Sequence, residues 1–104
     1  MNTTFRIEVA EIAERELREI FAYIAKENLT AARNLMATFG KMAASLETFP
    51  TRCPLIPEND RLGKRFRHLI HGSYRMIFTV ESNTVLILHL IHGARLLDPM
   101  DLEN

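Results

Sequence analysis

The sequence predicts an α+β domain in which a helical hairpin packs on a small, mainly antiparallel sheet, in the order β-α-α-β-β-β. Three observations predict it: a short alternating stretch opens the chain, two segments of helical period follow, and three alternating segments with tight turns fill the C-terminal half. The chain has 104 residues, 47% hydrophobic and 25% charged, as in an ordinary globular protein. We expect one domain over residues 1–104, with residues 97–104 as a flexible acidic tail.

The first two expected elements are a strand and a helix. Residues 5–9 alternate apolar and charged side chains, which is typical of a half-buried strand. From about Glu11 to Glu27 the period is helical, and acidic residues fill the first two turns, where the helix dipole favours anions. We expect Asn28 to end this helix in a left-handed conformation. The apolar stripe consists of Ala13, Leu17, Ile20, Phe21 and Ile24.

A second helix is expected to follow at once, with Thr30 as its N-cap and its end near Thr48. Because the connection is so short, the two helices must form an antiparallel hairpin. Small residues on the face away from the stripe leave two interpretations open, close approach of another helix or solvent exposure: Ala37, Gly40 and Ala44. The core stripe consists of Ala32, Leu35, Phe39, Met42, Leu46 and Phe49.

Three strands are expected after an irregular loop that three prolines enforce through about Gly63. They cover residues 64–71, 74–81 and 84–92, with turns at residues 72–73 and 82–83. The last strand is apolar on both faces, so we expect it to be central or covered. In the middle strand, alternation places Tyr74, Met76, Phe78 and Val80 on one face and Arg75, Ile77, Thr79 and Glu81 on the other.

Several classes of protein are excluded by composition. The longest apolar run, residues 84–91, is far short of the roughly 20 residues that cross a bilayer, and the N-terminus has no apolar signal core, so we expect a cytoplasmic protein with no membrane contact. The single cysteine, Cys53, excludes an internal disulfide framework. Histidines spaced three apart on a strand point to opposite faces, so such a pair cannot bind one metal ion together, and we expect no metal site. We also expect no cofactor.

Charge is unevenly distributed along a chain whose net charge is zero. Residues 61–95 carry six Lys and Arg side chains against one acid, and they hold all four histidines. This predicts a surface that meets an acidic partner, or else a solvated face of the sheet. Physical chemistry alone permits an anion-binding surface or a small ribonuclease here. The candidate residues are Arg65, Arg67, His71, Arg75, His92 and Arg95.

Residues 72–78 contain Tyr-Arg followed by apolar and aromatic residues, and residues 85–95 end in His-Gly-Ala-Arg. These two C-terminal segments resemble the RelE/ParE superfamily of type II toxins. The first helix and the basic strand after Pro50 also agree, so the resemblance covers residues 5–95. It implies a RelE/ParE-like fold and a toxin that a cognate antitoxin holds inactive in a hetero-oligomer, with DNA contacted only through that complex.

The two branches of the superfamily imply different functions. The His-Gly-Ala-Arg ending and the long hairpin resemble ParE-like members, which inhibit DNA gyrase by binding, act in plasmid stabilisation and growth arrest, and have no catalytic residues of their own. The candidate residues would then bind the target or the partner. The alternative is a RelE-like, ribosome-dependent mRNA endonuclease, against which the acidic tail and the lack of a tyrosine after Tyr74 argue. There His92 would transfer a proton, and the scissile phosphate would be held by Arg65, Arg67, Arg75 and Arg95.

A single hairpin can cover the sheet only partly, which predicts a groove and an open sheet edge. We expect an antitoxin segment to fill both, with an amphipathic helix in the groove and an added strand on the sheet. Its acidic residues would meet the basic strand residues.

Overall fold

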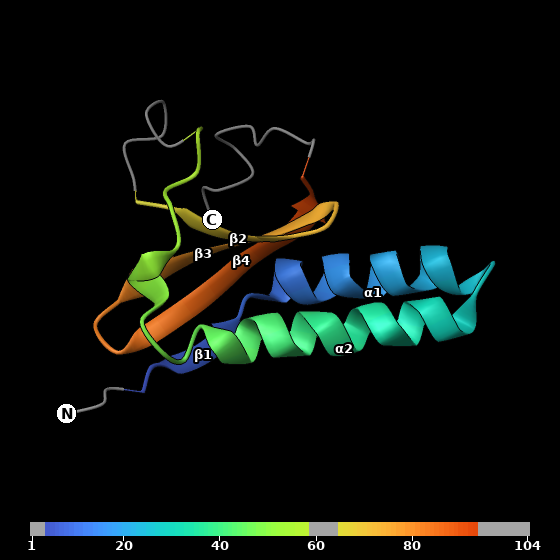
Figure 1. Ribbon diagram of the computed structural model, residues 1–104, viewed down its shortest axis with the longest axis horizontal. Helices are drawn as coiled ribbons and strands as arrows, with labels where there is room; N and C mark the ends of the chain where they lie inside the picture. Colours follow the sequence, from blue (N-terminus) through green and yellow to red (C-terminus); the bar gives the residue numbers. More distant parts are fainter. Residues whose placement is uncertain (1–3, 59–64, 94–104) are drawn as a thin grey trace.

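Two helices lie side by side across one face of a four-stranded sheet in the computed structural model, which describes residues 4–58 and 65–93 (Figure 1). This confirms the predicted α+β order. None of the helices in the described ranges is long and apolar enough to cross a membrane. The elements are β1 (Arg6–Val9), α1 (Glu11–Ala25), α2 (Leu29–Ser45), a 3-10 turn η1 (Pro50–Arg52), β2 (Arg67–His71), β3 (Tyr74–Glu81) and β4 (Thr84–His92).

The sheet has the strand order β1-β4-β3-β2, so β4 is central, as its two apolar faces predicted. β1 runs parallel to β4, and the other neighbouring strands are antiparallel. Both tight turns lie where they were predicted, with positive φ angles of 58° at Gly72 and 52° at Ser82. β2 begins at Arg67, later than predicted, and residue 64 and the predicted acidic tail lie outside the described residues.

The connection between the helices differs from the prediction. Asn28 is not a left-handed stop for α1, because its backbone is extended, with φ of −154° and ψ of 97°. Its side-chain oxygen accepts a hydrogen bond from the backbone N–H of Ala31 at 2.9 Å. Asn28 is therefore the N-cap of α2, and Thr30, the predicted cap, lies inside the first turn. The antiparallel hairpin itself is confirmed (Figure 1).

The end of α2 also comes earlier than predicted. Phe49 does not continue the core stripe: it has a left-handed φ of 49°, and it is 66% exposed. Arg52 supplies the physical reason, because its Nη1 donates to the main-chain oxygens of Ser45, Thr48 and Phe49 at 3.3, 2.8 and 3.1 Å. These bonds satisfy carbonyl groups at and just beyond the helix end, so the chain turns away there.

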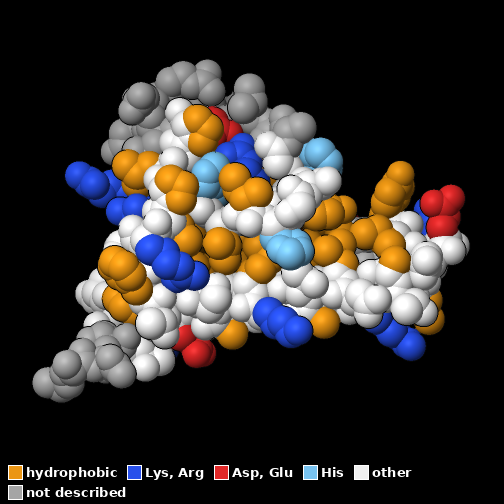
Figure 2. Space-filling view, viewed as in Figure 1, with side chains coloured by type: hydrophobic (Ala, Val, Ile, Leu, Met, Phe, Trp, Pro, Cys, Tyr) orange, Lys and Arg blue, Asp and Glu red, His pale blue; other side chains and the backbone are white. Residues whose placement is uncertain are grey.

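The sheet separates two clusters of buried apolar side chains. On the helix side, Phe39 and Met42 pack with Met76 and Phe78, which confirms the alternation predicted for β3. Figure 2 shows hydrophobic side chains gathered between the sheet and the helices on this face of the molecule. On the other side, the connection between α2 and β2 (residues 46–66, described at 46–58 and 65–66) covers the sheet. The cluster there consists of Ile56, Phe66, Ile77 and Ile91.

Candidate functional site

The predicted site residues lie in several separate environments. Arg65 is exposed just before β2. Arg95 lies outside the described residues. Arg67 is half-buried, and its Nη1 donates to the main-chain oxygens of Cys53, at 2.6 Å, and Thr51, at 3.3 Å. Its guanidinium therefore holds the connection in place.

Arg75 lies on the connection side of the sheet, where it is only 3% exposed. Its guanidinium forms a two-pronged ion pair with Glu58: Nη1 donates to Oε1 at 3.2 Å and Nη2 to Oε2 at 2.5 Å. Nη1 also lies 3.3 Å from Nδ1 of His68. Because a buried charge is stable only when it is paired, this contact ties the connection to β3.

The two exposed histidines, His71 and His92, lie in one row across the sheet. Register pairs His71 of β2 with Tyr74 of β3, and Tyr74 with His92 of β4. The Tyr74 ring contacts both the imidazole of His92, at a centroid distance of 5.9 Å, and Phe39 of α2, at 5.5 Å. This row faces the helices, so it lies on the opposite side of the sheet from Arg75.

His68 and His71 point to opposite faces of the sheet, as their spacing predicted. His68 is buried under the connection, whereas His71, three residues later, is exposed on the helix side. Among the described residues, no group of three or more His, Cys, Asp or Glu side chains could hold a metal ion. Cys53 is also buried, and desolvation raises the pKa of its thiol, which keeps it protonated and neutral.

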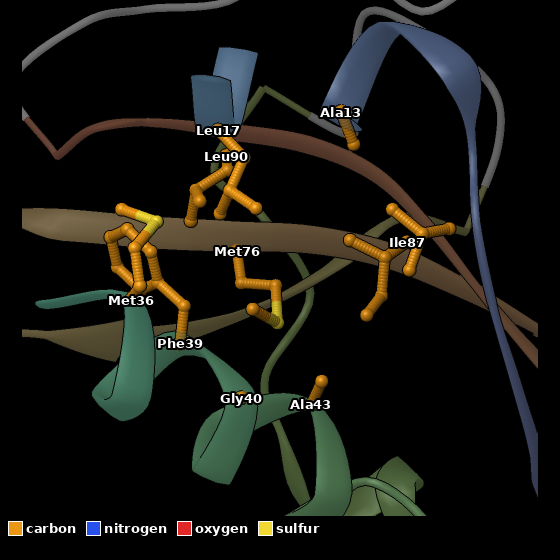
Figure 3. A pocket seen from close by; sticks show the side chains of 10 residues that line it. Ala13, Leu17, Met36, Phe39, Gly40, Ala43, Met76, Ile87 and Leu90 are labelled. Atoms are coloured by element: carbon orange, nitrogen blue, oxygen red, sulfur yellow. The ribbon is translucent and has the colours of Figure 1, made fainter. Parts of the chain in front are cut away.

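An apolar groove of about 210 Å³ opens between the two helices, with the sheet as its floor. Ala13 and Leu17 line it from α1, Gly40 and Ala43 from α2, and Met76 from β3, as Figure 3 shows. A Cβ added at Gly40 would meet no atom within 4 Å, so the small residue leaves the groove wide. Ala37 and Ala44, the other two members of the small set predicted on the face away from the core stripe, are solvent-exposed in this chain.

A second hollow, of about 460 Å³, lies between α2 and β2. Lys41 of α2 and His71 of β2 line it, together with the apolar side chains of Met42 and Leu69. A third, of about 330 Å³, lies between α1 and the end of β4, where His92 is a lining residue. The exposed histidines thus belong to two different hollows, on either side of Tyr74.

The two outer sides of the sheet differ. On the β2 side, the described part of the connection pairs with the start of the strand, where His68 N–H donates to Pro54 C=O at 3.2 Å. In an antiparallel pair successive residues alternate in direction, so Ile70, which is 59% exposed, also directs its backbone groups outward. Within the described ranges, no strand pairs with this edge of β2.

On the β4 side, Glu16 of α1 accepts a hydrogen bond from the part of β4 that extends beyond the end of β1. Ala10 N–H donates to Ile87 C=O at 2.8 Å, and the next contact along the edge is Leu90 N–H to Glu16 Oε1 at 3.0 Å. The same carboxylate lies 3.1 Å from Nδ1 of the buried His89. Glu16 therefore covers part of β4 beyond the end of β1, and the outer strands of the sheet are β1, of four residues, and β2, of five.

Residues 7–97 match the family model of the ParE toxin of the type II toxin–antitoxin system parDE. This chain belongs to the ParE toxin family. A search of curated proteins gives no significant match.

Solved structures share the fold of this ParE family member. The toxin–antitoxin complex RelBE2 from Mycobacterium tuberculosis matches with a TM-score of 0.65 and 20% identity, covering 89% of this chain and 95% of that chain. A chromosomal ParDE toxin–antitoxin system from P. aeruginosa matches with a TM-score of 0.66 and 13% identity, covering 86% of this chain and 97% of that chain. These matches confirm the RelE/ParE-like fold.

Sequence patterns did not predict the roles of two acidic residues in this ParE family member. Glu58 neutralises Arg75, and Glu16 covers the β4 edge. The sequence does contain a signal for the role of Glu58. Arg75 shares a strand face with the apolar Ile77, and an arginine on a buried face needs a partner of opposite charge. For Glu16 the sequence indicates only a favourable position near the start of α1, because its contact with the backbone of β4 depends on how α1 lies against that strand.

Proposed function

We propose that this chain is a toxin that inhibits DNA gyrase by binding to it, without catalytic residues of its own. Beside family membership, the observation that supports this is the separation of Arg75 from His92. A ribonuclease needs a proton-transfer group and phosphate-binding arginines around the same phosphate. Arg75 is buried against Glu58 on one side of the sheet, whereas His92 is exposed on the other.

We also propose that a cognate antitoxin neutralises this chain in a cytoplasmic hetero-oligomer, through which alone DNA is contacted. The groove between the helices has the apolar lining that an amphipathic helix of a partner requires. The outward backbone groups at Ile70 suit an added strand. Lys41 lies beside His71 in the hollow between these two features, so acidic residues of the antitoxin would meet the positive charge of Lys41 there.

The exposed members of the predicted set would contact the target. Arg65, His71 and His92 have side chains open to solvent, and Arg95 is proposed with them on the sequence resemblance alone. In a binding interface, individual side chains act through fit and desolvation, so their removal weakens inhibition by degrees. Arg75 is unsuitable for such a test, because Arg75→Glu would place two carboxylates together in a buried site.

The experiment compares purified wild type with three variants in a gyrase supercoiling assay and in an mRNA cleavage assay on translating ribosomes. We expect inhibition of supercoiling and no cleavage. Arg65→Glu and Arg95→Glu should weaken inhibition strongly, while His92→Ala weakens it by about tenfold or less. Circular dichroism of each variant provides the control for folding.

Cleavage of mRNA on ribosomes that is completely lost in His92→Ala would contradict the proposal and favour the endonuclease. In cells, expression without antitoxin should produce filaments and an induced DNA-damage response. Arrested translation without that response would also contradict it.

A further inference from the structure

Three ionisable side chains are enclosed where the connection lies on β2 and β3. Glu58, His68 and Arg75 are 4%, 9% and 3% exposed. The guanidinium of Arg75 donates to both oxygens of Glu58 and lies 3.3 Å from Nδ1 of His68. A guanidinium stays protonated and only donates, so Nδ1 of His68 must accept. The arrangement therefore requires a neutral imidazole with its proton on Nε2.

A proton added at Nδ1 would change this contact from attraction to repulsion. An N–H of His68 would then face an N–H of Arg75 inside a site with little water. Burial is the main cause that lowers the pKa of His68, the positive charge of Arg75 lowers it further, and Glu58 acts in the opposite direction. Among the described residues, these two are the charged groups that act on the ring.

These side chains hold a segment that other contacts also attach to the sheet. Backbone bonds join Ile56 N–H to Phe66 C=O at 2.9 Å and His68 N–H to Pro54 C=O at 3.2 Å, and Arg67 Nη1 donates to the main-chain oxygens of Cys53 and Thr51. Among the described residues, the apolar cluster beneath has four buried members, fewer than the cluster on the helix side. The ionisable contacts therefore act together with these bonds and a small apolar cluster, so weakening them should lower the stability of the closed segment.

We propose that Glu58, His68 and Arg75 form a pH-sensitive clasp that fastens the connection to the sheet, and that proton uptake by His68 loosens it. The direction of the pH dependence follows from the linkage between proton binding by His68 and closure of the clasp. Unfolded or detached, His68 has its ordinary pKa near 6.5, and in the closed clasp its pKa is lower. The closed form therefore has its full stability above about pH 6.5 and loses stability as the pH falls below that value. The device is independent of the toxin's target.

Amide hydrogen exchange in the full chain tests the clasp. When the pH is lowered from about 7.5 to about 5.5, the protection of Ile56 N–H, corrected for the intrinsic exchange rate, should fall. The fall should reach up to about tenfold for each unit by which the pKa of His68 differs between the closed and the detached form. Protection at Phe39 N–H, in the helix layer, should fall less. In His68→Gln, whose amide oxygen can accept from Arg75 at every pH, the loss at Ile56 should disappear. His71→Gln, an exposed histidine on the same strand, is the matched control and should keep it.

A second measurement covers the case in which His68→Gln does not fold. In the wild-type protein, ¹⁵N shifts of the imidazole rings report the protonation state and tautomer of each histidine. We expect His68 to be neutral with its proton on Nε2, and to titrate below its ordinary pKa of about 6.5. Titration of His68 at or above that value, protection at Ile56 that is independent of pH, or loss of the effect in His71→Gln would each overturn the proposal.

Discussion

Arg52, Arg67 and Arg75 each use a guanidinium group to hold oxygen atoms in or beside the connection between α2 and β2. Arg52 donates to carbonyl groups at the end of α2, Arg67 to carbonyl groups in the connection, and Arg75 to a carboxylate. The planar fork of five donors suits this work, since one side chain can satisfy several acceptors. Arg67 and Arg75, two of the six basic residues in 61–95, therefore hold structural oxygens, which restricts the surface available for an anionic partner.

Glu58→Gln should destabilise the protein by about 3–5 kcal/mol, because it leaves the guanidinium of Arg75 buried without a full counter-charge. Urea unfolding at neutral pH measures the loss in free energy of unfolding. The double variant Glu58→Leu, Arg75→Met removes both charges, and we expect it to be more stable than Glu58→Gln. Equal stability of Glu58→Gln and wild type would show that the ion pair does not hold the connection.

At the scale of elements, the start of α2 depends on one side chain. Asn28→Ala removes the acceptor for Ala31 N–H and should lower the free energy of unfolding by about 1 kcal/mol. Thr30→Ala is the matched control, because Thr30 lies inside the helix and should change stability by less. A urea titration of both variants measures the difference. A larger loss in Thr30→Ala would contradict the assignment of the cap.

Most elements could be predicted because their periodicity is local. Each helix and strand was found, and the two tight turns lie at the predicted residues. Boundaries were less accurate where a single hydrogen bond decides them: Asn28 and Thr30 are both good caps by composition, and only the fold selects one. Phe49 continued the apolar spacing of α2, but Arg52, from outside the helix, ended the helix before it.

The candidate site was harder to predict, because its geometry depends on which elements cover each face. Alternation correctly separated Arg75 from Tyr74, yet it could not show that the connection buries one face. The exposed His71 and His92 were predicted together, and the structure places them in one row on either side of Tyr74. Glu58 and Glu16 act across long sequence separations, which no local pattern records.

At the scale of the whole molecule, β2 is an outer strand of the sheet, and the backbone groups of Ile70 point away from β3. Ile70→Pro removes an N–H that points away from β3, so the fold should tolerate it, as edge strands tolerate proline. We expect the variant to keep its thermal stability within a few degrees and to bind antitoxin at least about tenfold more weakly. Calorimetric titration with the cognate antitoxin measures this.

Leu69→Pro is the comparison for that test. The backbone N–H of Leu69 points toward β3 in the ladder. Proline at this position removes that N–H, so it should unfold the hairpin rather than only weaken binding. Unchanged antitoxin affinity in a folded Ile70→Pro variant would show that the added strand does not form at β2.

The parallel pairing of β1 with β4 also fixes the order in which the protein can be made. Arg6 lies opposite Thr84, so β1, which is synthesised first, cannot pair until β4 has been synthesised. β3 needs that same central strand, whereas the two helices can associate as soon as both are translated. A ribosome that stalls before codon 84 thus holds a chain without the central strand of its sheet. Translation must therefore pass β4 before the complete sheet of the toxin can form.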